Sequence, residues 1–202
     1  MGLDQDRLLR TAVRVSNTLR SHGVRFALAG GCAVYAHGGP ASDHDLDVFL
    51  TERDAPLART ALVAAGLRPV DPPEDWLTKV YDDDCLVDLI FRPNGRPVTP
   101  ALLDSAEEMR VGATVAPVLP ATELLVDKLL VLGEHRCDLT GLLPVARAVR
   151  ERVDWPSVAA ETASSPYARA FLGLLADLGV VSADDVAPRR DAAIPMTRKE
   201  SR

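Results

Sequence analysis

Cysteine is scarce in this sequence, which has only Cys32, Cys85 and Cys137 among its 202 residues. The count is odd, and no two cysteines have the CxxC spacing that is typical of zinc and redox sites. A disulfide framework or a zinc site is therefore not expected, and reduced thiols in a cytosol are the simplest interpretation.

The chain also lacks a basic excess and a long apolar run. Its 23 lysines and arginines against 29 aspartates and glutamates give a net charge of −6. This balance predicts no broad basic face for binding nucleic acid, although it does not exclude a local basic groove. No apolar stretch approaches the roughly 20 residues that cross a bilayer. Residues 1–6 include Asp4 and Asp6 and lack an apolar run, so we expect no signal peptide. We expect a cytoplasmic protein with no membrane partner.

The sequence does have the composition of a globular protein with a core, at 47% hydrophobic and 26% charged residues. Its length fits one domain, or a catalytic domain with a helical extension. We expect a catalytic domain over 1–119, a helical extension packed on it over 120–186, and a disordered tail over 187–202, where Asp, Pro, Arg and Lys dominate.

Apolar periodicity and turn residues predict the elements along the chain. The pattern favours helices over 4–22, 54–65, 122–132, 139–152 and 165–178, and strands over 24–29, 43–50, 78–81 and 85–91. The segment 109–119 is predicted to be one further extended stretch. Asp82-Asp83-Asp84 could form a metal site, but a hairpin turn is the better interpretation, because aspartate favours turns.

Asp45 and Asp47 are the most informative pair in the chain. Alternate side chains of a strand point to the same face, so the two carboxylates are expected to project together while Leu46 and Val48 project oppositely. Like charges held this close repel unless a cation compensates them. Oxygen ligands on a stiff strand suit Mg²⁺, which completes its shell with water and phosphate oxygens. The pair therefore predicts a metal and a phosphate-bearing substrate.

Asp88 lies in a strand that is apolar on both faces, where a carboxylate is costly to bury unless it is paired or bound to a metal. If this strand neighbours that of Asp45 and Asp47, three carboxylates converge as in a two-metal site, whose ions lie about 3.5–4 Å apart. The alternative places Asp88 at a solvent-exposed edge.

Gly30 and Gly31 stand where a predicted strand gives way to a short helix. Glycine allows close approach of the backbone to a ligand, and a helix N-terminus offers free N–H groups to an anion. A glycine pair alone is a weak signal, and its weight comes from the Asp-x-Asp motif that follows.

The run Leu28-Ala29-Gly30-Gly31, then Asp45-Leu46-Asp47, then Asp88 resembles the signature of the DNA-polymerase-β-like nucleotidyltransferase superfamily. The chain looks most similar to small bacterial members related to abortive-infection type nucleotidyltransferase toxins. The resemblance covers residues 24–91 well and the helical part more faintly. It departs from many relatives in having Ala41-Ser42-Asp43 where they place Arg-x-Thr, which puts one substrate contact in doubt.

The resemblance implies an α+β nucleotidyltransferase fold, a mixed β-sheet flanked by helices with a C-terminal helical extension. It implies two Mg²⁺ ions held at Asp45 and Asp47, with Asp88 completing the metal site or taking the proton of the attacking hydroxyl. The phosphates of a nucleoside triphosphate would contact the turn at Gly30 and Gly31.

Lys128 is the best candidate outside this core motif. Its neighbours at helical spacing, Leu124 and Val131 among them, are apolar, so its ammonium needs an anionic partner. The related toxins carry a lysine on a helix here, which implies a phosphate contact. The alternative is a side chain that snorkels to solvent.

Arg136 and Asp138 follow in a segment that lines the active site of relatives, although Asp138 is also a good helix N-cap. Trp76 and Trp155 are interpreted as packing residues.

The sequence thus favours a Mg²⁺-dependent nucleotidyltransferase that moves a nucleoside monophosphate to an acceptor hydroxyl and releases pyrophosphate. A degenerate nucleotide-binding or antitoxin-like regulator is the alternative, and another Asp-x-Asp enzyme, a phosphatase or glycosyltransferase, is a third. Transfer RNA, a protein and a small molecule all stay open as acceptors. A cognate antitoxin is a further possible partner.

Overall fold

A mixed seven-stranded sheet forms the centre of the N-terminal part of the chain, in a computed structural model that describes residues 5–42 and 45–187. The strand order is β3-β4-β5-β2-β1-β7-β6. The bounds are β1 Phe26–Leu28, β2 Leu46–Leu50, β3 Arg68–Val70, β4 Leu77–Asp82, β5 Cys85–Ile90, β6 Glu107–Val111 and β7 Thr114–Val118. The pairs β2–β5 and β1–β7 are parallel and the other pairs are antiparallel.

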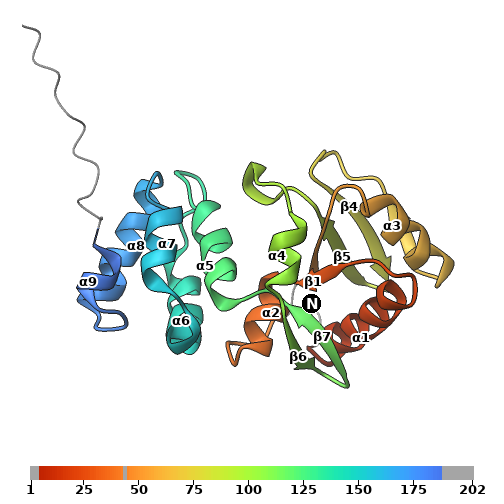
Figure 1. Cartoon of the computed structure of the whole chain (residues 1–202), viewed down its shortest axis with the longest axis horizontal. Coiled ribbons are helices and arrows are strands. Elements are labelled where there is room, and N and C mark those ends of the chain that lie inside the picture. The colour runs from red at the N-terminus through yellow and green to blue at the C-terminus, as the bar shows by residue number, and fades with distance from the viewer. Residues whose placement is uncertain (1–4, 43–44, 188–202) are drawn as a thin grey trace, which may run out of the picture.

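One group of helices flanks this sheet, and a second group follows the last strand toward the C-terminus (Figure 1). The first group is α1 Gln5–Ser21, α2 Gly30–Ala36, α3 Ala55–Ala64 and α4 Pro100–Asp104. The second group is α5 Ala121–Leu130, α6 Leu139–Val149, α7 Trp155–Glu161, α8 Pro166–Asp177 and α9 Ala183–Val186, which lie together at one end of the molecule. The α+β class and the C-terminal helices are as predicted.

The core forms because apolar residues recur at the period of each element. In α1, Leu8, Ala12, Val15 and Leu19 are fully buried and lie three or four residues apart, which is the stripe of an amphipathic helix. Helices α1 and α3 contact each other and pack against β5. The buried residues of sheet and helices form one continuous cluster that also includes the C-terminal helices.

The hairpin between β4 and β5 is confirmed, with Asp82 paired to Cys85 and Asp83 in the left-handed region at φ +53°. The prediction of one extended stretch over 109–119 is wrong. Gly112, at φ +59°, turns the chain between β6 and β7. Its missing side chain also leaves room for Leu9, whose Cβ would lie 3.2 Å from an added Cβ.

The division of the chain at residue 119 into two domains stays a prediction. Strand β7 ends at Val118 and helix α5 begins at Ala121, so the change from sheet to helices falls where the sequence placed it. The predicted tail over 187–202 lies outside the described residues, apart from Ala187. Among the described residues, no helix is both long enough and apolar enough to span a membrane.

Candidate active site

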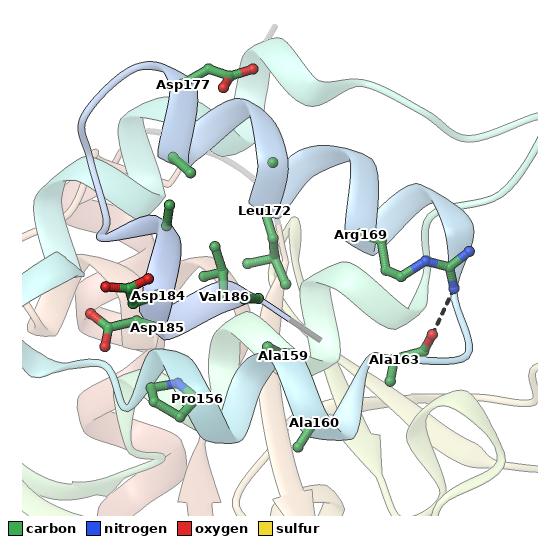
Figure 2. A pocket seen from close by; sticks show the side chains of 14 residues that line it. Pro156, Ala159, Ala160, Ala163, Arg169, Leu172, Asp177, Asp184, Asp185 and Val186 are labelled. Atoms are coloured by element: carbon green, nitrogen blue, oxygen red, sulfur yellow. Dashed lines mark hydrogen bonds between the residues drawn. The ribbon is translucent and has the colours of Figure 1, made fainter. Parts of the chain in front are cut away.

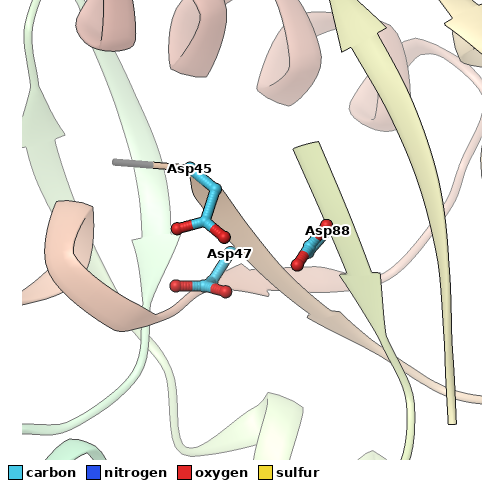
Figure 3. A group of neighbouring side chains, drawn as sticks. All are labelled: Asp45, Asp47 and Asp88. Carbon is cyan, nitrogen blue, oxygen red and sulfur yellow. The ribbon is translucent and has the colours of Figure 1, made fainter. Parts of the chain in front are cut away.

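The side chains of Asp45, Asp47 and Asp88 converge at one point of the sheet (Figure 3). Strands β2 and β5 are parallel neighbours, and their register sets Asp47 directly opposite Asp88. Asp45 lies just before β2, two residues from Asp47. Each of the three residues offers a carboxylate oxygen, and these oxygens all lie within 4.8 Å of one another. The predicted neighbourhood of the two strands is therefore confirmed, and Asp88 is 6% exposed rather than at a solvent-exposed edge.

The charge of this cluster is only partly compensated. Burial, the Asp45 carboxylate and the Asp88 carboxylate raise the pKa of Asp47 to about 8, while Lys128 acts in the opposite direction. Burial also raises the pKa of Asp88, against the effect of Lys79. The Asp88 Oδ1 atom is buried and has no hydrogen-bond partner. An additional cation at this point would relieve both costs.

Lys79 is a site residue that the sequence interpretation missed. It pairs across the β4–β5 ladder with Asp88, and its Nζ lies 3.5 Å from Asp88 Oδ2. The signal was present, because a two-residue turn at Asp83 and Asp84 fixes the register of the hairpin and puts residue 79 opposite residue 88.

Gly30 and Gly31 lie beside the cluster and leave room for neighbouring side chains. A Cβ at Gly30 would lie 1.7 Å from Asp47 Oδ2, and one at Gly31 would lie 2.3 Å from Ser42 Oγ. Gly30 also has a φ of +58°. The glycine pair thus leaves space for the Asp47 carboxylate and for Ser42, and the predicted phosphate contact stays a prediction.

A cavity of about 530 Å³ adjoins Gly30 and Asp47, between the sheet and helix α5. Its charged lining residues are Arg92, Asp127, Lys128 and Arg136, in addition to Asp47. Burial raises the pKa of Asp127, and the neighbouring Lys128 opposes this shift. Asn94 donates from Nδ2 to Asp127 Oδ1 at 2.5 Å, which ties the turn Pro93–Gly95 to α5.

The structure separates the remaining predicted residues. Lys128 and Arg136 line this cavity, whereas Asp138 does not. The Asp138 carboxylate caps helix α6, because its Oδ1 accepts from the backbone N–H of Thr140 at 3.0 Å and of Gly141 at 3.3 Å. Trp155 is a packing residue, as predicted, but Trp76 lines the cavity and is partly exposed.

A second cavity, of about 630 Å³, lies among the C-terminal helices α7, α8 and α9 (Figure 2). Its lining is mostly alanine and other apolar residues, with Asp177, Asp184 and Asp185 along it. Among the lining residues, Arg169 donates to the Ala163 carbonyl at 2.7 Å. Asp45, Asp47 and Asp88 do not line this cavity. The 530 Å³ cavity, which Asp47 lines, is therefore the candidate active site.

No protein-family model matches the sequence, and no curated protein matches it. Solved structures are similar in fold. ANT(2″)-Ia in complex with adenylyl-2″-tobramycin has a TM-score of 0.60 at 12% identity, over 77% of this chain and 95% of that chain. A solution structure of the antibiotic-resistance factor ANT(2″)-Ia has a TM-score of 0.57 at 13% identity, over 85% of this chain and 94% of that chain.

The lincosamide antibiotic adenylyltransferase LnuA, bound to lincomycin, has a TM-score of 0.52 at 11% identity, over 76% of this chain and 100% of that chain. At these identities the likeness concerns the fold. The chain has the nucleotidyltransferase fold, which the Gly-Gly, Asp-x-Asp and Asp88 pattern predicted.

Proposed function

We propose that this protein is a Mg²⁺-dependent nucleotidyltransferase, which moves a nucleoside monophosphate from a nucleoside triphosphate to an acceptor hydroxyl. The observation that carries the proposal is the convergence of Asp45, Asp47 and Asp88 beside a cavity that also holds Lys128. A nucleotidyltransferase fold around this cluster supports it.

The three carboxylates fit a divalent cation. They offer oxygen ligands only, which Mg²⁺ prefers, and they carry a charge that Lys79 alone does not balance. The buried, unpartnered Asp88 Oδ1 is a ligand atom without another use among the described residues. Asp45, Asp47 and Asp88 would hold Mg²⁺, which when bound neutralises charge on the phosphate oxygens.

The cationic side chains of the cavity account for binding of the triphosphate. Lys128 and Arg136 line the wall opposite the sheet, and Lys128 lies close enough to Asp47 to affect its pKa. Their positive charges would pair with the phosphates and orient the leaving pyrophosphate. Gly30 leaves room at this end of the cavity for the Asp47 carboxylate.

The reaction is an in-line substitution at the α-phosphorus. A bond forms between the acceptor oxygen and the α-phosphorus, and the bond from that phosphorus to the oxygen bridging to the β-phosphate breaks. Pyrophosphate leaves with the electron pair of that bond. The acceptor hydroxyl gives up its proton as the new bond forms, and the Asp88 carboxylate is the proposed proton acceptor.

The test incubates the protein with each of the four α-labelled nucleoside triphosphates, Mg²⁺ and panels of small hydroxyl compounds, RNA and proteins. Small compounds come first, because two of the similar structures contain small-molecule antibiotics or their adenylylated product. We expect label transfer that requires Mg²⁺. If no nucleotide binds at millimolar Mg²⁺, the proposed nucleotidyltransferase activity is rejected.

Nucleotide binding without any transfer would instead favour the degenerate, regulatory alternative. The substitution of Ala41-Ser42 for the basic residue that many relatives carry is the feature that favours it. Kinship to abortive-infection toxins, a cognate antitoxin and a cytoplasmic location stay predictions.

A further inference from the structure

Trp76 is an exposed aromatic side chain at the candidate active site. It is 36% exposed and lines the cavity that holds Lys128. No described residue accepts a hydrogen bond from its indole N–H, whereas Trp155, which is 7% exposed, donates its indole N–H to Arg150 O at 3.1 Å. Of the two indole N–H groups, only that of Trp155 thus donates a hydrogen bond to a described residue.

The backbone at Trp76 is firmly held. Its carbonyl oxygen accepts from the N–H of Phe91 at 3.1 Å and from that of Arg92 at 3.2 Å. The Arg92 guanidinium, in turn, lies 2.8 Å from the Asp75 carboxylate and donates to the Asp75 carbonyl at 3.2 Å. The backbone that carries the indole is therefore fixed at the end of the sheet, which lowers the entropic cost of ligand binding.

The sheet register sets the spacing between the carboxylates and the apolar floor of the cavity that Trp76 lines. Cross-strand partners share a face, so Asp47, Asp88 and Lys79 form one row across β2, β5 and β4. The next row on that face starts with Phe49 and Ile90, two residues or roughly 6.6 Å further along. Both line the cavity. Ile90 pairs with Leu77, the residue after Trp76.

This arrangement matches the layout of a nucleotide. Phosphates belong at the carboxylate and Lys128 end, and a ribose separates the α-phosphate from the base by about the spacing of one row. The apolar surface of Phe49 and Ile90 would then lie under the ribose and base, and the indole would face the base.

We propose that Trp76 is the aromatic platform on which the nucleobase of the triphosphate stacks, so that it is a determinant of nucleotide affinity. This inference rests on the proposed function of the same site. Stacking on an indole tolerates every base and is strongest for the larger purine rings. We therefore expect purine nucleotides to bind more tightly than pyrimidine nucleotides.

Tryptophan fluorescence provides the first test. The chain has two tryptophans, so in the Trp155→Phe variant Trp76 is the only reporter. Titration with ATP, GTP, CTP and UTP in Mg²⁺, without acceptor, is expected to quench its emission, most strongly for the purines. Inorganic tripolyphosphate, which has no base, is expected to bind by calorimetry without quenching.

Three results would overturn the inference. Binding of ATP by calorimetry with no quenching would remove Trp76 from the base site and leave the proposed function intact. Quenching only after an acceptor is added would make Trp76 an acceptor platform. If neither ATP nor tripolyphosphate binds, the inference falls together with the proposed function.

Variants give the second test. Trp76→Ala is expected to raise the Kd for ATP about tenfold and leave that for tripolyphosphate unchanged, whereas Trp76→Phe retains most of the ATP affinity. Tyr35→Ala removes an equally exposed aromatic (37%) outside the cavity and is expected to have no effect. A parallel loss of ATP and tripolyphosphate affinity in Trp76→Ala would indicate a structural role instead.

Discussion

Two groups of three aspartates lie in or next to the strands of this sheet, and they differ in how far other residues compensate their charge. Asp82, Asp83 and Asp84 close the β4–β5 hairpin, and Asp45, Asp47 and Asp88 meet where β2 runs alongside β5. The sequence alone makes the first group the more conspicuous, because its members are consecutive.

The hairpin group is compensated by helix α1. Thr11 donates to Asp82 Oδ2 at 2.8 Å and Arg14 pairs with the same carboxylate. Arg7 lies 3.1 Å from Asp84 and 4.0 Å from Asp83, both of which are highly exposed. Charges from within the fold and water therefore satisfy these carboxylates.

The convergent group has much less support. Within the described part of the chain, Lys79 is the one cation in salt-bridge contact with it, through Asp88 Oδ2. Burial and mutual repulsion hold the pKa of Asp47 at about 8. Incomplete compensation of charge, rather than the number of carboxylates, therefore distinguishes a cation site from a structural acidic turn.

The largest expected contrast is in catalysis. Asp47→Asn keeps the shape of the side chain but removes a metal ligand, so we expect nucleotidyl transfer to fall at least about a thousandfold. Asp84→Asn, in the compensated group, is the matched control and is expected to transfer label normally. Equal activity of the two variants would contradict the distinction between the groups.

The pH dependence of stability is expected to distinguish Asp47 from the hairpin aspartates. The pKa of Asp47 is 3.8 in the reference state and about 8 in the folded protein, so the folded state holds the proton more tightly. For this group, stability is greatest below its unfolded pKa and falls as the pH rises toward 8, by on the order of a few kcal/mol.

Denaturant unfolding in EDTA at pH 5, 6.5 and 8 measures this effect. Asp47→Asn, which does not titrate, is expected to lose less stability over the range than the wild type, and added Mg²⁺ is expected to restore wild-type stability at pH 8. Parallel curves for the two proteins would show that Asp47 ionises normally.

A smaller effect on stability is expected at the hairpin. Asp82→Ala removes the partner of Thr11 and Arg14, so we expect the free energy of unfolding to drop by about 1–3 kcal/mol. Denaturant unfolding gives the value, and the Mg²⁺ concentration that supports half-maximal transfer is expected to stay unchanged. A shift in that concentration would mean that the hairpin communicates with the metal site.

The smallest effect is expected for the cation that faces the convergent group from α5. Lys128→Met keeps the length and apolar stem of the side chain and removes a phosphate partner, so we expect the KM for the triphosphate to rise about tenfold. Steady-state kinetics with Lys128→Arg as the charge-conserving control checks this. An unchanged KM would support the snorkelling interpretation.

The sequence was sufficient for the features that local patterns determine. The alternation around Asp47 predicted that Asp45 and Asp47 share a face, and the acidic run at residues 82–84 predicted the hairpin. The meeting with Asp88 depends on the pairing of β2 with β5, which the residues left conditional and the family resemblance implied. The register of that hairpin also contained the Lys79–Asp88 pair, although the interpretation did not use it.

The remaining features depend on tertiary packing. Helix α5 is separated from β2 by some 70 residues of sequence, so periodicity could not place Lys128 or Arg136 in one cavity with Asp47. The exposure of Trp76 likewise depends on where α5 and the turn Pro93–Gly95 lie. Gly112 was overlooked because the residues on both sides of it read as a single strand.

Manganese binding tests most directly whether Asp45, Asp47 and Asp88 form a divalent-cation site. Mn²⁺ occupies the same oxygen-rich sites as Mg²⁺ and is visible by electron paramagnetic resonance. The titration is made with and without a non-hydrolysable triphosphate. We expect the wild type and Asp84→Asn to bind Mn²⁺ saturably, and Asp45→Asn/Asp47→Asn to lose that binding. Indistinguishable titrations of the wild type and the double variant would show that Asp45 and Asp47 do not form a divalent-cation site.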